Sequence, residues 1–232
     1  MIRRSFLLTA AAAFAIAATA AQPAMAREQW TKEQANTWYD KQPWLVGANY
    51  APGSAVNEIE MWHEATFDPA TIDKELGWAA GIGMNTMRVF LHNLLWENDP
   101  EGLKKRMNEF LAIADKHKIK IMFVLFDSVW DPNPVYGLQS PPIPGVHNSR
   151  WVQAPGEARL KDAGQYHKLE AYVKDIVGTF ANDKRVIVWD VWNEPNNKGG
   201  GNYEHIPDKN KYVALLLPQV FEWARSANPS QP

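Results

Sequence analysis

The feature that most constrains the fold of this chain is the segment from Val186 to Pro195, Val-Ile-Val-Trp-Asp-Val-Trp-Asn-Glu-Pro. Its apolar, β-branched and aromatic residues predict a strand that is covered on both faces. Pro195 has no amide hydrogen with which to continue a strand ladder, so we expect the strand to end at Asn193 and Glu194. A carboxylate at the carboxyl end of a parallel strand lies where α/β barrels keep their catalytic groups.

The remainder of the chain alternates between strand and helix patterns. Strands are predicted at 44–50, 86–91, 119–126 and 186–194, and helices at 69–80, 102–117, 164–180 and 210–227. This order predicts an α/β fold with parallel strands and right-handed crossovers. A doubly wound sheet is the alternative, but no Gly-x-Gly-x-x-Gly turn follows the first strand. The sequence has neither a P-loop nor histidines at metal-ligand spacing.

The tripeptide Asn193-Glu194-Pro195 at the end of a fourth strand resembles the retaining glycoside hydrolases of clan A, and family 5 in particular. The resemblance implies a (β/α)8 TIM barrel, of which residues 45–232 would supply the first four βα units. A closed barrel needs about 250 residues, and an open half would leave unpaired strand edges. We therefore expect an N-terminal fragment of a longer protein, with a compact four-unit α/β domain as the alternative.

The resemblance also implies roles for three residues. Glu194 matches the general acid/base, and Asn193 matches the asparagine that binds the sugar 2-hydroxyl. Arg88 matches the arginine that orients the nucleophile, and the alternative is an ordinary buried ion pair, for instance with Asp190. Retention requires two carboxyl groups about 5–5.5 Å apart, and the acid needs a raised pKa. The family's nucleophile is a glutamate at the end of the seventh strand, beyond residue 232. The resemblance implies no cofactor and no metal.

Other residues near the strand ends are candidates for binding sugar. Asn49 and Tyr50 end the first strand, His92 follows the second, and Asp127 ends the third. His92 could equally be a satisfied loop residue, and a binding or structural role suits Asp127 better than that of nucleophile. Where the family often has a histidine after the third strand, this chain has Ser128-Val-Trp-Asp131. That departure puts the subfamily, and with it the substrate, in doubt.

Tryptophan is abundant, with 11 residues in the chain. Sugar rings stack on aromatic side chains, but tryptophan also packs cores wherever it occurs. Trp130 and Trp192 lie at strand ends and are candidate stacking platforms. We expect packing roles for four others, Trp62, Trp78, Trp96 and Trp223. The long loop over roughly 127–160 is expected to be functional, and its part from Tyr136 to Trp151 could form a polysaccharide rim or a rigid lid.

The first 26 residues have the pattern of a cleaved signal peptide. Arg3 and Arg4 precede Phe6 and an alanine-rich apolar run, which resembles a twin-arginine signal. The run is short for a membrane anchor, so we expect export to the periplasm or outside the cell, with residues 27–44 forming an N-terminal cap. Removing residues 1–26 leaves 22 basic against 26 acidic residues, a net charge of −4. A chain of this net charge offers no broad positive surface with which to bind nucleic acid. The absence of cysteine excludes disulfides.

These observations lead to three hypotheses on function. The first is a secreted retaining β-glycosidase that hydrolyses a β-linked polysaccharide such as cellulose, mannan or xylan, with endo-action favoured. The second is a non-catalytic or vestigial protein that binds such an oligo- or polysaccharide without cleaving it. The third is an unrelated barrel enzyme such as a lyase or an esterase, although no Gly-x-Ser-x-Gly occurs for an esterase nucleophile.

Overall fold

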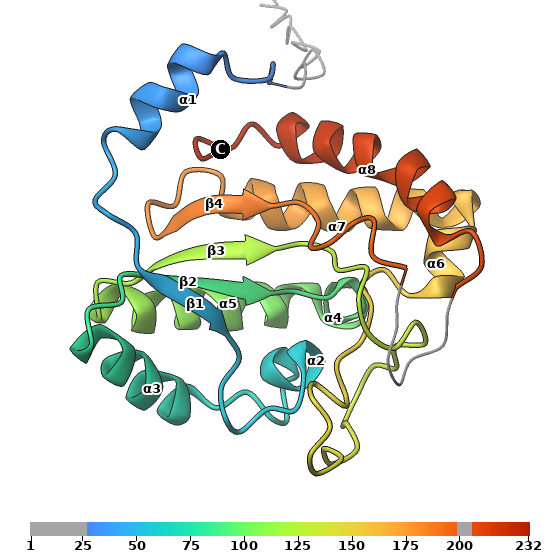
Figure 1. The fold of residues 1–232 in the computed structure, drawn as a ribbon, viewed down its shortest axis with the longest axis horizontal. Coiled ribbons are helices and arrows are strands. Elements are labelled where there is room, and N and C mark those ends of the chain that lie inside the picture. Colours follow the sequence, from blue (N-terminus) through green and yellow to red (C-terminus); the bar gives the residue numbers. More distant parts are fainter. Residues whose placement is uncertain (1–26, 199–205) are drawn as a thin grey trace, which may run out of the picture.

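The predicted parallel sheet is present in the computed structural model, which describes residues 27–198 and 206–232. Its strands lie in the order β1-β2-β3-β4, and each pair is parallel (Figure 1). The strands span Gly47–Tyr50, Thr86–Phe90, Lys120–Val124 and Val186–Asp190. An α/β fold of four strands alternating with helices is thereby confirmed. The predicted signal peptide lies outside the described residues.

The helices include all those expected from the sequence. The long ones are α3 (Pro69–Gly81), α5 (Pro100–Lys116), α7 (Tyr166–Thr179) and α8 (Lys209–Ser226). The segment expected to form an N-terminal cap contains one further helix, α1 (Lys32–Tyr39). Three short helices and a 3-10 turn were not predicted: α2 (Glu58–Trp62), α4 (Asn93–Asn98), α6 (Glu157–Lys161) and η1 (Ala163–Gln165). Each spans six residues or fewer, too short to show a helical period in the sequence.

Aspartate followed by proline starts two of the long helices. The Asp68 side chain accepts a hydrogen bond from Thr71 N at 3.0 Å, and Pro69 occupies the first turn of α3. Asp99 does the same for α5 by accepting from Gly102 N at 3.0 Å, with Pro100 in the first turn. The predicted start of α5 at residue 102 was therefore two residues late.

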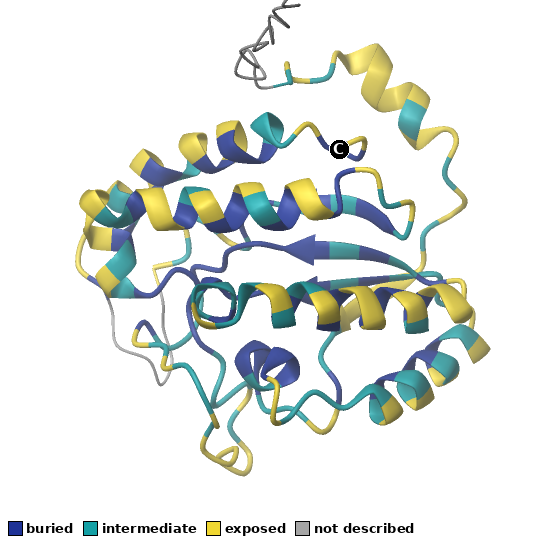
Figure 2. Ribbon diagram, turned by 180° about the vertical axis from the view of Figure 1, so that it is seen from behind, coloured by how far each residue is buried: buried dark blue, intermediate teal, exposed yellow. Residues whose placement is uncertain are grey.

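The two faces of the sheet differ in burial. Alternate residues of β2, β3 and β4, such as Val89, Phe123 and Trp189, are buried against the helices, which turn their buried sides to the sheet in Figure 2. Their neighbours in the strands, such as Arg88 and Met122, are only half-buried on the other face. The expectation that β4 is covered on both faces is corrected: Val188 and Asp190 are half-buried too.

The two edges of the sheet also differ. On β1, residues 47–49 are exposed. On β4, Trp189 N donates to the carbonyl of Pro232 at 3.1 Å, so the segment after α8 lies along that edge. The N-terminal segment reaches the same region, where Arg27 N donates to Arg225 O at 3.2 Å. No helix in the described ranges is long and apolar enough to cross a membrane.

Three of the four tryptophans expected to pack do so. Trp62 is fully buried, Trp223 is buried on α8, and Trp96 packs partly buried while its indole N–H donates to Asp175 at 2.7 Å. Trp78 is an exception, because its side chain is 63% exposed on α3 and lies over the Lys74 ammonium. The packing role predicted for Trp78 was wrong: one exposed position of an amphipathic helix carries an aromatic residue.

Candidate active site

A cleft of about 880 Å³ opens at the carboxyl end of the sheet. Such a volume is typical of ligand sites, which span about 300–1,000 Å³. The cleft combines polar groups from the strand ends with aromatic groups from the β3–α6 loop. Its lining includes Asn49, Tyr50, Arg88, Phe90, Asp127, Trp130, His147, Asn148, Trp151, Asn193, Glu194 and Asn197.

The ends of β3 and β4 continue their pairing beyond the strands. Asp127 and Asn193 form a parallel bridge, in which Asn193 N donates to Phe126 O at 2.8 Å and Ser128 N donates to Asn193 O at 3.2 Å. The chain then turns, since Asn197 N donates to Glu194 O at 2.9 Å, with Pro195 in the second position of the turn. This geometry fixes the backbone of Asn193 and Glu194 at the cleft.

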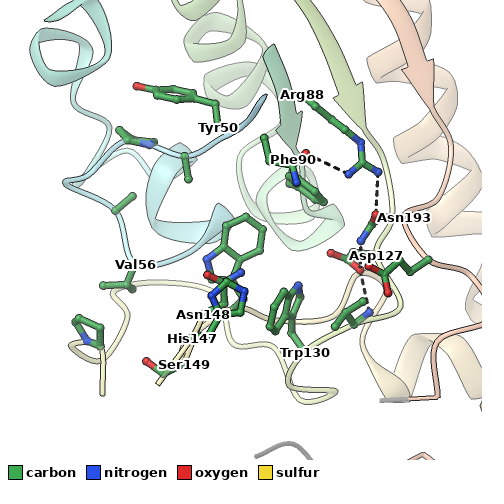
Figure 3. A pocket seen from close by; sticks show the side chains of 18 of the residues that line it. Tyr50, Val56, Arg88, Phe90, Asp127, Trp130, His147, Asn148, Ser149 and Asn193 are labelled. Atoms are coloured by element: carbon green, nitrogen blue, oxygen red, sulfur yellow. Dashed lines mark hydrogen bonds between the residues drawn. The ribbon is translucent and has the colours of Figure 1, made fainter. Parts of the chain in front are cut away.

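A chain of polar contacts crosses the sheet beneath the cleft (Figure 3). Arg88 Nη2 donates to Asn193 Oδ1 at 2.8 Å, and Asn193 Nδ2 donates to Asp127 Oδ1 at 3.0 Å. Arg88 Nη1 also donates to Asn49 Oδ1 at 3.3 Å. Because both ends of the Asn193 amide are engaged, its orientation is fixed, and its second N–H can donate to a ligand.

Arg88 also forms the ion pair with Asp190 that the sequence alone leaves open. Arg88 Nε donates to Asp190 Oδ2 at 2.9 Å, and both side chains are about a quarter exposed. The ion pair and the contact with Asn193 coexist, so Arg88 both pairs with a strand carboxylate and positions a cleft residue.

Asp127 is the buried carboxyl group of the cleft. Its side chain accepts from Val129 N at 2.8 Å as well as from Asn193. Burial raises the pKa of Asp127 to about 6, an effect that these hydrogen bonds oppose and that the nearby Glu194 carboxylate reinforces. Glu58, the first residue of α2, is also buried, and burial raises the pKa of its carboxyl group well above the ordinary value. Burial thus favours the neutral form of two carboxyl groups, that of Asp127 in the cleft and that of Glu58 on α2.

Glu194 is the exposed carboxylate of the cleft. Its Oε2 accepts from Asn197 Nδ2 at 2.7 Å, within the turn described above. Its backbone has a φ of 46°, in the left-handed region that is uncommon for residues with a side chain. Strained positions of this kind cluster at ligand sites and active sites. Glu194 is therefore held in a defined place and is open to a ligand.

The cleft collects seven of the nine residues proposed from the sequence for catalysis or binding. They are Asn49, Tyr50, Arg88, Asp127, Trp130, Asn193 and Glu194. The described residues contain no group of three or more His, Cys, Asp or Glu that could hold a metal ion.

His92 does not belong to the cleft, and the binding role proposed for it is corrected. Its ring is fully buried, with Nδ1 accepting from Leu94 N at 3.1 Å as the cap of α4. Nε2 lies 3.0 Å from Gln153 O. Burial lowers the pKa of His92 to about 4, so the ring is neutral at pH 7. The alternative of a satisfied structural histidine is the correct one.

Trp192 is also a packing residue and not a sugar platform. Its side chain is buried against Phe126, with ring centroids 5.2 Å apart, and its indole N–H donates to Ser128 Oγ at 2.8 Å. The sequence placed Trp192 beside Asn193 at the strand end. Alternation along the extended chain sends these two side chains to opposite sides, and only Asn193 faces the cleft.

Several cleft residues were not identified from the sequence. Phe90 ends β2, and Asn197 closes the turn after Glu194. His147, Asn148 and Trp151 come from the far end of the β3–α6 loop. The loop's length and its aromatic residues were the available signal, and the predicted rim from Tyr136 to Trp151 included all three. Which of its side chains turn inward depends on long-range backbone contacts.

The sequence matches no family model, and no curated protein matches it. Among solved structures, the chain is similar to GH5_18 from Streptomyces cattleya in complex with GlcNAc, with a TM-score of 0.51 and 12% identity over 81% of this chain. A variant of the same protein in complex with Manβ1-4GlcNAc gives a TM-score of 0.51 and 13% identity over 75% of this chain. The match covers 43% and 42% of those solved chains. The described residues therefore have the fold of part of a glycoside hydrolase family 5 barrel, as the resemblance at Asn193-Glu194-Pro195 implied.

Proposed function

We propose that this chain is part of an exported retaining β-glycosidase that hydrolyses a β-linked polysaccharide, with Glu194 as the general acid/base. The observation that carries the proposal is the pair Asn193-Glu194 at the carboxyl end of β4, one residue fixed by Arg88 and Asp127 and the other exposed in the cleft. Support also comes from the fold, which matches part of a family 5 barrel.

In this mechanism Glu194 protonates the glycosidic oxygen as the bond to the leaving group breaks. The same carboxylate then takes a proton from the water that releases the sugar from the nucleophile. Asn193 uses its second N–H to bind a hydroxyl of the sugar next to the bond being cut. The resemblance to family 5 implies a nucleophilic glutamate on a seventh strand, beyond residue 232.

Mannan is the first substrate class to test among cellulose, mannan and xylan. The GH5_18 structures contain GlcNAc and Manβ1-4GlcNAc, the latter a β-mannosyl disaccharide. Export remains a proposal based on residues 1–26, and N-terminal sequencing of the secreted protein is its test. A mature chain that starts at Arg27 would support cleavage after Ala26, whereas an intact Met1 would contradict it.

Replacement of Glu194 by glutamine tests the proposed acid in the protein that carries this chain. We expect turnover of β-1,4-mannan to fall by orders of magnitude, because a glutamine cannot donate the proton, while aryl glycosides with good leaving groups should lose less. Glu222→Gln, on the exposed side of α8, is the matched control and should leave turnover unchanged. A loss of only a few-fold for Glu194→Gln would exclude the acid/base role.

Glycan binding without hydrolysis is the second candidate, and one observation favours it. The carboxyl groups among the described lining residues are Asp127 and Glu194, and Asp127 is buried beneath the contacts from Val129 and Asn193. Sequencing of the coding DNA beyond Pro232 separates the candidates. A further strand that ends in glutamate at the seventh position favours the glycosidase, whereas a stop codon favours the binding protein.

A further inference from the structure

Lys209, the first residue of α8, buries its charged side chain. The residue is 3% exposed, whereas lysine is almost never fully buried unless it is paired. Its ammonium donates a hydrogen bond to the carbonyl oxygen of Ser128, a neutral partner that leaves the charge in place. Burial lowers the pKa of Lys209 for this reason. An ion that is costly to bury therefore holds one backbone group just after β3.

Ser128 is in turn hydrogen-bonded to the turn after β4. Ser128 N donates to Asn193 O at 3.2 Å, and Ser128 Oγ donates to Pro195 O at 3.3 Å. The same hydroxyl accepts from Trp192 Nε1 at 2.8 Å. With its carbonyl bound by Lys209, every polar group of Ser128 is engaged. Ser128 is buried, and it joins the end of β3 to the turn after β4 and to the start of α8.

Glu194 lies between two of the residues that Ser128 binds. Its φ of 46° is unfavourable for a residue with a side chain, and such a conformation persists only where the surrounding structure imposes it. Ser128 binds backbone carbonyl groups on both sides of Glu194, those of Asn193 and Pro195. The backbone of the proposed acid therefore depends on the place of Ser128, and that place depends on the contact from Lys209.

The ammonium of Lys209 also acts on Asp127, the residue before Ser128. Attraction between the two groups raises the pKa of Lys209, against the larger effect of burial. The Asp127 carboxyl group accepts from Asn193 Nδ2 at 3.0 Å, and Ser128 N donates to Asn193 O. One buried cation therefore acts on both of these residues that bind Asn193.

We propose that Lys209 is a positioning residue for the general acid/base, which it holds in place through Ser128. The inference rests on the proposed function and adds to it a residue of α8. The contact keeps Ser128 in the position at which the Glu194 carboxyl group reaches the glycosidic oxygen. Its loss should weaken proton transfer to the leaving group, while Arg88 still fixes the Asn193 amide for sugar binding.

The test compares Lys209→Met and Lys209→Arg in the protein that carries this chain. Methionine has a similar length but removes the charge and the donor, whereas arginine keeps both. Turnover is measured on β-1,4-mannan, whose leaving group needs protonation, and on an aryl β-mannoside with a good leaving group. Lys211→Met is the matched control, because Lys211 is an exposed lysine in the first turn of the same helix.

The expected result is a loss that depends on the leaving group. Lys209→Met should lower kcat at least about tenfold on mannan and about threefold or less on the aryl mannoside, with little change in KM. Lys209→Arg should recover part of the loss, and Lys211→Met should leave turnover of both substrates unchanged. A merely structural role predicts the same factor on both substrates, because it changes only the amount of active protein. Equal losses would overturn the proposal, and so would unchanged turnover.

Thermal unfolding shows whether Lys209→Met is folded. If it is not, Ser128→Ala takes its place in the test, because it keeps the carbonyl that Lys209 binds and removes the hydroxyl that binds Pro195. It should show the same selective loss on mannan, and equal losses on the two substrates would overturn the proposal here as well.

An NMR titration of the Asp127 carboxyl group tests the placement of the ammonium without reference to activity. The pKa of Asp127, about 6, should rise in Lys209→Met and change little in Lys209→Arg, because a nearby cation favours the carboxylate. Glu194 and Glu58, the other carboxyl groups that interact with Asp127, are present in both variants. An unchanged pKa in Lys209→Met would overturn this placement.

Glu194→Gln separates this inference from the proposed function. Full turnover of mannan by Glu194→Gln would overturn the proposed function, and the positioning role with it. A large loss in Glu194→Gln together with none in Lys209→Met would overturn the role of Lys209 alone.

Discussion

The helix-covered face of the sheet and its carboxyl-terminal end are built from the same strands under opposite demands. On the covered face, side chains such as Phe123 and Ile121 are apolar and fully buried. At the carboxyl end, a buried carboxyl group has a raised pKa and two residues, Trp130 and Glu194, have positive φ. The first region stabilises the fold. The second lowers that stability, because it holds strained and buried polar groups in place for a ligand.

The largest loss of stability should follow truncation on the covered face. Phe123 is fully buried on β3, with its ring 5.8 Å from Trp189. Phe123→Ala should lower the free energy of unfolding by about 3–5 kcal/mol, because it removes a large apolar group and leaves a cavity. Urea denaturation measures this. A loss below about 1 kcal/mol would mean that the covered face is not the stabilising region.

Replacement of Asp127 by asparagine should raise the free energy of unfolding near neutral pH. This effect is opposite in sign to that of Phe123→Ala and smaller. Its pKa is about 6 in the folded protein, whereas the ordinary pKa of an aspartate, which applies to the unfolded chain, is 3.8. The folded state therefore keeps a proton that the unfolded chain has lost, so the stability from this group is greatest below pH 4 and is lost as the pH rises through 6. Relative to the unmodified chain, Asp127→Asn should gain about 2 kcal/mol between pH 4 and pH 7.

Urea denaturation of both proteins across that pH range checks this prediction. Glu194 and Lys209, whose charges act on Asp127, are present in both proteins, and so is the buried Glu58. Their contribution therefore largely cancels in the difference. A difference that stays constant with pH would show that Asp127 is ionised without cost, and the contrast between the two regions would lose its electrostatic part.

The smallest effect is expected at Trp78, which belongs to neither region. Its side chain is 63% exposed on α3, and its ring contacts the ammonium of Lys74 at 5.1 Å. Trp78→Ala should change the free energy of unfolding by no more than about 0.5 kcal/mol. A loss above about 2 kcal/mol in urea denaturation would show that this tryptophan packs, as its residue type suggested.

The same contrast explains what the sequence could predict. Strands, long helices and their order follow from apolar periodicity and from caps such as Asp68-Pro69, which act locally. Glu194 and Asn193 were found because a short motif fixes them at a strand end. His92 and Trp192 were misassigned because proximity to a strand end does not determine which way a side chain points. His147 and Trp151 depend on hydrogen bonds across more than 20 residues of loop, such as that between Asp127 and Ala154.

The chain of contacts through Asn49, Arg88, Asn193 and Asp127 takes Asn49 from β1, Arg88 from β2, and Asp127 and Asn193 from the segments that directly follow β3 and β4. Its members stay within hydrogen-bond distance only while the strands keep their present stagger and twist. A substitution far away that alters the curvature of the sheet would therefore move the Asn193 amide. Selection for activity would then act on the shape of the whole sheet, and the side-chain amide resonances of Asn193 would report on that shape in solution.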